Sequence, residues 1–243
     1  MKNIKIEYEY DGSGFFGFQR QLSARTVQGE IESALRLVLK EEITLNSSGR
    51  TDRGVHAYMQ VSNFFTTSKI PIDRLEFALK NLIPGDIKIH TMMQVPEEFH
   101  ARFSAKSRAY EYIMGWDRTA FETKYVSSVK GEVEPEKLEK ILEPLVGRHN
   151  FEGFRLADCS GKSPVREISE IKCYKKDRNK IGVYIRGNAF LKSQIRIIMG
   201  TALAVYFGKR PKNYLINKLK NPDNRAEKIV AEGSGLYLCD IEY

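Results

Sequence analysis

GRTDRGVHA, residues 49–57, is the stretch that indicates both the fold and the candidate site of this chain. It places one carboxylate, Asp52, between two guanidinium groups, Arg50 and Arg53, and it leads into the apolar run VHAYMQVSNFF at residues 55–65. A run of this length, rich in core-type residues, predicts a long strand. We therefore expect the charged cluster at the end of a sheet, where this strand begins, rather than on a distant loop.

The charged residues of this stretch allow two interpretations. Taken alone, they are typical of a solvated turn, because Asp-x-Gly suits a tight reversal of the chain. Their position before a core strand favours a functional interpretation. Neighbouring arginines favour the ionised form of a carboxylate, and an anchored carboxylate can act as nucleophile or base on an anionic substrate whose phosphates are bound by cations. Asp52 is thus the candidate catalytic group.

Strands and helices alternate along the chain in two similar rounds. The predicted strands cover residues 4–10, 55–65, 87–95, 107–116, 166–176, 180–187 and 235–243, and the predicted helices begin near residues 26, 71, 135, 190 and 212. Most strands alternate polar and apolar residues, which indicates mainly antiparallel sheets covered by helices. We expect an α+β fold of two pseudo-duplicated α+β halves, residues 1–104 with Asp52 and residues 105–243.

Charge and composition limit the partners. The net charge of +8 and the pI of about 9.2 favour a polyanionic partner, although a basic surface can also serve solubility alone. Three scattered cysteines and four isolated histidines argue against a disulfide framework and a metal site. The N-terminus has no signal-peptide core, and no apolar run is long enough to span a bilayer, so we expect a cytoplasmic protein without membrane contact.

A second motif, GSGFFG at residues 12–17, matches the glycine pattern of dinucleotide-binding proteins. That fingerprint requires a helix that opens at the third glycine and a preceding strand that is buried on both faces. Here the next helix is expected only from Thr26, and the preceding strand is half polar. A dinucleotide enzyme is therefore a rival hypothesis, and we expect instead that these glycines let the backbone approach another segment closely.

Residues along the whole chain, together with the first motif, form a recognisable pattern. In chain order they are 10–12, 17, 19, 26–28, 49–52, 54–57, 60–61, 81–82, 84, 86–87, 99–104, 108, 110, 112, 190–191, 196, 200 and 235–238. They span nearly the whole chain, and the pattern GRTD-x-GVHA is highly specific. On these residues the chain resembles the TruA family of tRNA pseudouridine synthases.

The resemblance implies a role for individual residues. Asp52 matches the essential aspartate, which is implicated in breaking the uridine N1–C1′ bond so that the uracil can reattach through C5. Tyr110 matches the tyrosine that stacks on the target base, and Arg196 matches the basic residue that pairs with the aspartate. Leu236 falls in the segment that closes over the base. An active-site cleft between the two halves is implied as well.

The expected substrate contacts are arginines: Arg50, Arg53, Arg20 and Arg108. The resemblance implies a homodimer, a tRNA substrate modified at anticodon stem-loop positions 38 to 40, and no cofactor or metal. A non-catalytic basic RNA-binding protein is the alternative that composition alone allows equally well. The chain departs from the common family pattern at Arg53, at Ser193 and Gln194, and in lacking a proline near the C-terminus, which leaves the choice of RNA open.

Overall fold

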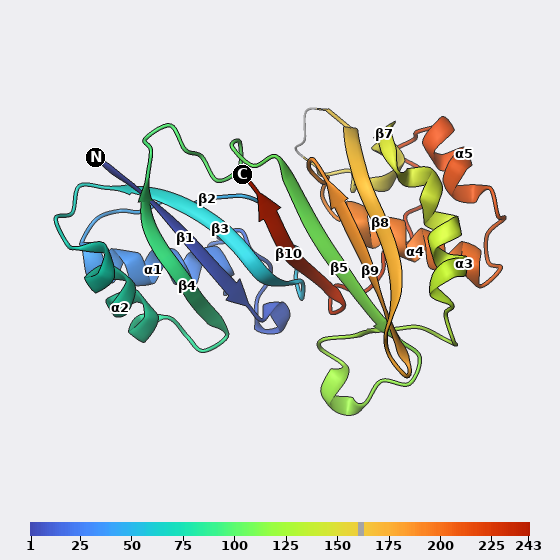
Figure 1. Cartoon of the computed structure of the whole chain (residues 1–243), viewed down its shortest axis with the longest axis horizontal. Coiled ribbons are helices and arrows are strands. Elements are labelled where there is room, and N and C mark those ends of the chain that lie inside the picture. The colour runs from blue at the N-terminus through green and yellow to red at the C-terminus, as the bar shows by residue number, and fades with distance from the viewer. Residues whose placement is uncertain (160–162) are drawn as a thin grey trace. The chain divides into compact units, whose positions relative to one another are not determined.

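The computed structural model describes residues 1–159 and 163–243, which form two compact units (Figure 1). Unit 1 comprises Met1–Lys106 and Tyr237–Tyr243, and unit 2 comprises Ser107–Leu236. The sequence-based division at residue 104 assigns the last strand to the C-terminal half. In the structure, residues Tyr237–Tyr243 belong to unit 1, where they pair with a strand of that unit, a long-range contact that local patterns do not reveal.

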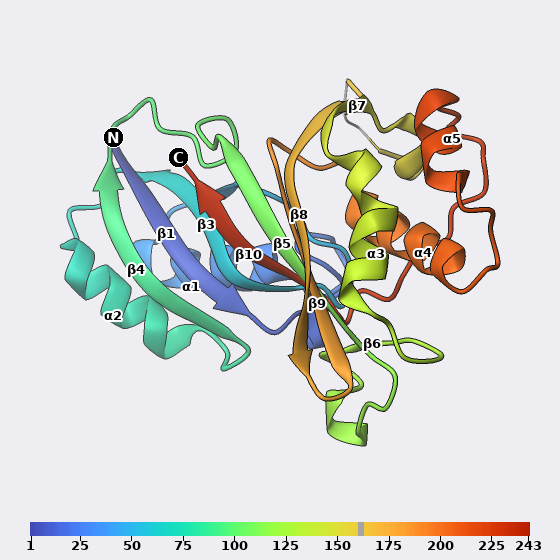
Figure 2. The same ribbon diagram turned by 45° about the vertical axis from the view of Figure 1, so that its right-hand side comes forward.

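Unit 1 is a sheet with two helices. The strands are β1 (Lys2–Tyr10), β2 (Asn46–Ser47), β3 (His56–Thr66), β4 (Ile87–Val95) and β10 (Leu236–Glu242). Their order is β4-β1-β3-β10, with β2 also paired to β3, and only the β3–β10 pair is parallel. Helices α1 (Val27–Leu39) and α2 (Ile72–Leu82) lie on one face of this sheet (Figures 1 and 2).

The core of unit 1 follows from the alternation in β1. Ile4, Ile6, Tyr8 and Tyr10 are each at most 4% exposed, while the intervening Glu7 and Glu9 are only half-buried. Helix α1 begins as predicted, since the Thr26 side chain accepts a hydrogen bond from the Gly29 amide at 3.3 Å.

Unit 2 also combines strands with helices. Its strands are β5 (Ser107–Gly115), β6 (Ser127–Ser128), β7 (Gly147–Asn150), β8 (Val165–Asp177) and β9 (Lys180–Gly187), in the order β5-β9-β8-β7, with β6 parallel to β5. Its helices are α3 (Pro135–Leu142), α4 (Gln194–Tyr206) and α5 (Tyr214–Lys220). Helix α3 packs against β8 and α4 (Figure 2).

The start of α4 differs from the prediction. The apolar pattern predicts a helix from about residue 190, but α4 begins at Gln194. Ser193 has a left-handed backbone (φ 57°), and the Gln194 side chain accepts a hydrogen bond from the Leu191 amide at 2.8 Å. This local capping arrangement delays the helix, and hydrophobic periodicity does not register it.

The predicted α+β class is confirmed: both units combine a mainly antiparallel sheet with helices. The three shortest strands, β2, β6 and β7, have two to four residues each and were not predicted, because so short a run has no periodicity. Within the described ranges, no helix is both long and apolar enough to cross a bilayer.

Candidate active site

Asp52 lies on the loop that joins β2 to β3. The Val55 amide donates a hydrogen bond to the Asp52 carbonyl at 3.1 Å, and Gly54 takes φ +75°, so the chain makes a tight turn directly after the carboxylate. Asp52 itself is half-buried, whereas Thr51 before it is 8% exposed. The structure thus places Asp52 just before the start of β3, at the end of the sheet, as predicted.

Three neighbouring segments hold the backbone just before Asp52. The Phe18 amide donates to the Thr51 carbonyl at 3.0 Å, and the Gln60 side-chain amide donates to the Gly49 carbonyl at 3.1 Å. The Tyr10 hydroxyl is 2.8 Å from the Thr51 hydroxyl in a buried hydrogen bond. Burial raises the pKa of Tyr10 well above its usual value, so the phenol stays protonated and the contact persists. The loop is therefore fixed to the sheet before any substrate binds.

The GSGFFG motif provides the close approach that its glycines predicted. A Cβ on Gly12 would lie 2.0 Å from the Val55 carbonyl oxygen. Gly17 has φ +94°, and a Cβ there would lie 3.2 Å from the Thr51 carbonyl oxygen. Both glycines thus let the residue 12–17 segment lie against the Asp52 loop. No helix opens at Gly17, so the geometry of a dinucleotide site is not formed.

His56 is a buried residue at the start of β3. Its Nδ1 accepts a hydrogen bond from the Gly12 amide at 3.0 Å, and its ring stacks on Tyr237 of β10 with centroids 4.7 Å apart. The 2% exposure of His56 leaves it little access to a substrate. Its contacts connect the start of β3 to the residue 12–17 segment.

Both arginines that flank Asp52 are exposed. Among the described residues, neither Arg50 nor Arg53 has a carboxylate within ion-pair distance. The Arg53 guanidinium carbon lies 4.3 Å from the centre of the Phe16 ring, which is 51% exposed. The sequence does not reveal this stack, because Phe16 and Arg53 are far apart in the chain.

Tyr110 and Arg196 both belong to unit 2. Tyr110 lies in β5, is 8% exposed and meets the Phe190 ring edge-on with centroids 5.3 Å apart. Arg196 lies in the first turn of α4 and is half-buried. Its Nε donates to the Ala231 carbonyl at 2.9 Å, while the Ala231 amide donates to the Arg196 carbonyl at 3.0 Å. Segment 229–231 was not identified from sequence, because it carries no motif of its own.

Segment 229–231 reaches α4 through another glycine. A Cβ on Gly200 would lie 2.2 Å from the Ile229 carbonyl oxygen. Leu236, at the start of β10, is 5% exposed, and its amide donates to the Gly233 carbonyl at 2.9 Å. Arg196 and Leu236 are therefore held at the two ends of one short connection, residues 229–236.

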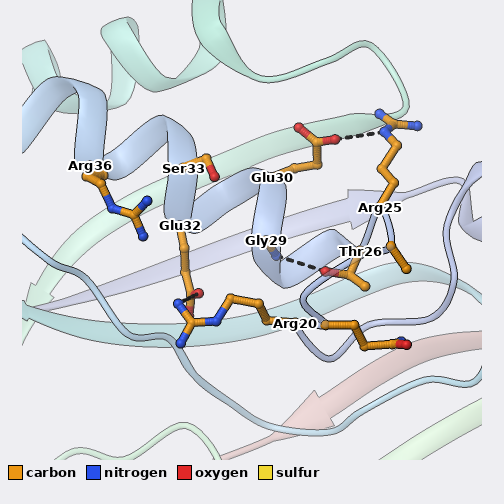
Figure 3. A pocket seen from close by; sticks show the side chains of 10 residues that line it. Arg20, Arg25, Thr26, Gly29, Glu30, Glu32, Ser33 and Arg36 are labelled. Carbon is orange, nitrogen blue, oxygen red and sulfur yellow. Dashed lines mark hydrogen bonds and ion pairs between the residues drawn. The ribbon is translucent and has the colours of Figure 1, made fainter.

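Arg20 and Arg108 each have a protein partner. Arg20 lines a pocket of about 290 Å³ beside the start of α1, shown in Figure 3, and its guanidinium lies 2.9 Å from the carboxylate of the buried Glu32. Arg108 is 7% exposed and donates to the Asn188 carbonyl at 2.9 Å. Arg108 is therefore a buried contact within unit 2, whereas Arg20 is paired with Glu32 and still has an exposed side chain, like Arg50 and Arg53.

Charge is distributed unequally between the units. Unit 1 contains 14 Lys and Arg against 15 Asp and Glu, a net charge of −1, and unit 2 contains 25 against 16, a net charge of +9. Many charges of unit 2 are paired, such as Lys176 with Glu111 and Lys180 with Glu122. Lys209, Lys212 and Lys220 are exposed and have no ion-pair partner among residues 1–159 and 163–243.

The described residues contain no cluster of three or more His, Cys, Asp or Glu side chains that could hold a metal ion. What unit 1 offers chemically is an anchored carboxylate between two exposed guanidinium groups. Such a site suits a nucleophile or base acting on a phosphate-containing substrate.

Comparison with known proteins identifies the family. The family model described as "tRNA pseudouridine synthase" matches residues 6–104 and 141–243. The chain is 38% identical to tRNA pseudouridine synthase A of Ruminiclostridium cellulolyticum and 37% identical to that of Caldicellulosiruptor bescii, each over 100% of both chains. Among solved structures, a chain of a Cbf5-Nop10-Gar1 complex matches with a TM-score of 0.43 and 11% identity, over 97% of this chain and 48% of that one.

Family assignment rests on the first two comparisons, which cover both units and include the Asp52 loop. The anchored aspartate and the matching sequence lead to one conclusion: this chain belongs to the tRNA pseudouridine synthase family.

Proposed function

We propose that this chain isomerises uridine to pseudouridine in the anticodon stem-loop of tRNA, at positions 38 to 40, with Asp52 as the catalytic carboxylate. The observation that carries the proposal is the Asp52 loop. It is held at Gly49 and Thr51 by three hydrogen bonds, and it presents Arg50 and Arg53 to the solvent. A loop that served only as a solvated turn would not need these buried contacts.

The reaction is an isomerisation that balances within the substrate. The N1–C1′ bond of the uridine breaks, a C5–C1′ bond forms, the C5 proton leaves and N1 gains a proton. Asp52 assists the bond breaking, by attack at C1′, by addition at C6 or by a glycal route. A uridine within an RNA stem-loop must first be flipped out and held against an apolar or aromatic surface.

We assign Tyr110 to contact with the flipped base and to proton removal from C5, Arg196 to pairing with the Asp52 carboxylate, and Leu236 to closure over the base. The support is the match of each residue to the family pattern, together with the fixed positions of Tyr110 against Phe190 and of Arg196 against Ala231. In this proposal Arg50 and Arg53 bind RNA phosphates directly. Arg20 and Arg108 do so by exchanging a protein partner for a phosphate.

The direct test is to incubate the protein with unmodified tRNA and to map pseudouridine at single-nucleotide resolution. The wild-type protein is expected to form pseudouridine in the anticodon stem-loop, and Asp52→Ala is expected to form none. Absence of product on every tRNA would refute the function, and equal product with Asp52→Ala would refute the role of Asp52. The alternative, a binder without chemistry, predicts no product and an affinity that survives Asp52→Ala.

We also propose, from the family resemblance, a homodimer that works in the cytoplasm. The subunit mass is 27.9 kDa. Light scattering at micromolar concentration is expected to give twice that mass, and the single-subunit mass would contradict the dimer.

A further inference from the structure

Arg53 and Phe16, two exposed side chains at the Asp52 loop, stack on each other. Arg53 follows the proposed catalytic carboxylate directly, and its guanidinium lies 4.3 Å from the centre of the Phe16 ring. A cation at this distance is attracted by the negative face of the ring. The stack restricts a long, flexible side chain while leaving its N–H edges open. No carboxylate of the described residues competes for them.

Phe16 is itself fixed by its backbone. Its amide donates to the Arg25 carbonyl at 2.9 Å, and its carbonyl accepts from the Gln21 side chain at 3.0 Å. The next residue, Gly17, lies so close to the loop that a Cβ there would be 3.4 Å from the Arg53 amide nitrogen. The Phe16 ring is therefore held in a fixed position beside the Asp52 loop, although half of its surface faces solvent.

A matching pair in the same segment shows what is different about Arg53. The Arg25 guanidinium also lies 4.3 Å from a ring, that of Phe15, but its donors are used by Asp86 at 2.6 and 2.9 Å and by Glu30 at 2.7 Å. Phe15 is 1% exposed. The Phe15–Arg25 pair is thus a closed structural contact, whereas the Phe16–Arg53 pair is open to a ligand.

From this geometry we propose that Phe16 and Arg53 form a clamp for a phosphodiester next to the target uridine. Guanidinium groups bind phosphate oxygens through paired N–H donors, and a guanidinium already stacked on a ring loses less freedom when it binds. Arg53 is the group that contacts the phosphate, and Phe16 is a positioning residue that acts through Arg53. The clamp rests on the proposed function, because it assumes that a uridine in RNA is brought to Asp52.

The first test is a double-mutant cycle in steady-state kinetics on unmodified tRNA. Arg53→Gln is expected to raise KM about tenfold with little change in kcat, since it removes one charge-assisted contact. Phe16→Leu keeps an apolar side chain but removes the ring face, and is expected to raise KM about threefold. The double variant should be no worse than Arg53→Gln alone, and Phe16→Tyr should restore the wild-type KM.

A matched control is Leu22→Ala, which removes a fully exposed apolar side chain from the same connecting segment and should leave KM unchanged. Effects of Phe16→Leu and Arg53→Gln that multiply in the double variant would overturn the clamp, as would failure of Phe16→Tyr to restore KM.

The second test identifies which phosphate of the tRNA Arg53 contacts. The substrate is a tRNA with one uncharged methylphosphonate linkage on the 5′ or the 3′ side of the target uridine. At one of the two sides this change should raise KM about tenfold for the wild type and hardly at all for Arg53→Gln. Equal penalties for both proteins at both linkages would contradict the clamp. A wild type that forms no pseudouridine on ordinary tRNA would instead refute the proposed function.

Discussion

Unit 1 and unit 2 have the same class of architecture and differ in how they carry charge. Unit 1 is nearly neutral and positions Asp52 between two exposed arginines, whereas unit 2 has a net charge of +9. The basic character of the chain is therefore a property of unit 2 alone. Under the proposed function, we expect the carboxylate chemistry to belong to unit 1 and most of the long-range attraction for RNA to belong to unit 2.

Both units also use a buried glycine to seat the segment next to a proposed catalytic residue, and this predicts the largest effect. Gly12→Ala would place a Cβ 2.0 Å from the Val55 carbonyl oxygen, and Gly200→Ala would place one 2.2 Å from that of Ile229. Each is expected to lower the free energy of unfolding by about 3 kcal/mol in urea denaturation. Gly85→Ala is the control, since no atom beyond its chain neighbours lies within 4 Å of the added Cβ. Similar stabilities for Gly12→Ala and Gly85→Ala would contradict the close approach.

Replacing Lys209, Lys212 and Lys220 by Gln tests the charge difference directly. These side chains are exposed and unpaired in the described structure, so they are available to phosphates. The triple variant should weaken tRNA binding about tenfold at 0.15 M salt and flatten its salt dependence by about two units of slope. Filter binding or fluorescence anisotropy over a salt series measures both quantities.

The matched control neutralises three exposed cations of unit 1, Lys40, Lys69 and Arg74. It should change the affinity and the salt slope much less than the triple variant in unit 2. Equal losses from both sets would show that the charge asymmetry has no part in binding.

The anchoring of the loop can be separated from the stability of the β1 core. Tyr10→Phe removes the buried hydrogen bond to Thr51, and Tyr8→Phe removes a similar one, 2.8 Å long, to Ser62. Each is expected to cost about 1 kcal/mol of unfolding free energy. Only Tyr10→Phe should also lower kcat, about fivefold, because only Thr51 adjoins Asp52. A kcat that falls equally in both variants would argue against a specific role for this contact.

The smallest expected effect concerns Lys218, a buried lysine of unit 2, which we expect to differ from the exposed lysines of the same unit. Burial lowers the pKa of Lys218, with repulsion from Lys228 adding to the shift. Its ammonium group donates to the Glu227 carbonyl at 3.1 Å. The unfolded chain therefore holds this proton more tightly than the folded one. As a result, the wild-type unfolding free energy, relative to that of Lys218→Met, should rise as the pH increases toward about 10.4.

The same Lys218→Met variant should bind tRNA within about twofold of the wild type, because a buried ammonium group does not meet phosphates. Urea midpoints at pH 7.5 and 9.5 and one binding curve measure the two quantities. A loss of affinity as large as that of the triple lysine variant would contradict this distinction.

Much of the fold could be predicted because its signals are local. The alternation in residues 4–10 and the Thr26 cap each depend on a few neighbouring residues, and both are present in the structure. The pairing of β10 with β3 was missed because it joins segments at opposite ends of the chain. The later start of α4 was missed because a side-chain hydrogen bond of Gln194 outweighs the apolar pattern.

The candidate site likewise has parts that a local sequence pattern predicts and parts that only the folded chain reveals. The motif identified the Asp52 loop, and the glycines at residues 12–17 indicated a close backbone approach. The groups that hold the loop, Tyr10 and Gln60, carry no sequence signal for that role, because each is also an ordinary strand residue. The Phe16–Arg53 stack likewise depends on the folded backbone at Gly17.

The central claim is that Asp52 carries the chemistry and that exposed lysines of unit 2 carry tRNA binding. Its most direct test is the single-turnover rate of pseudouridine formation with tRNA saturated by excess enzyme. Asp52→Asn should lower this rate by at least about 10³-fold while its tRNA affinity stays within about twofold of the wild type. The triple lysine variant should keep the wild-type rate once enough enzyme is added. An Asp52→Asn variant that forms pseudouridine at the wild-type rate would contradict the account.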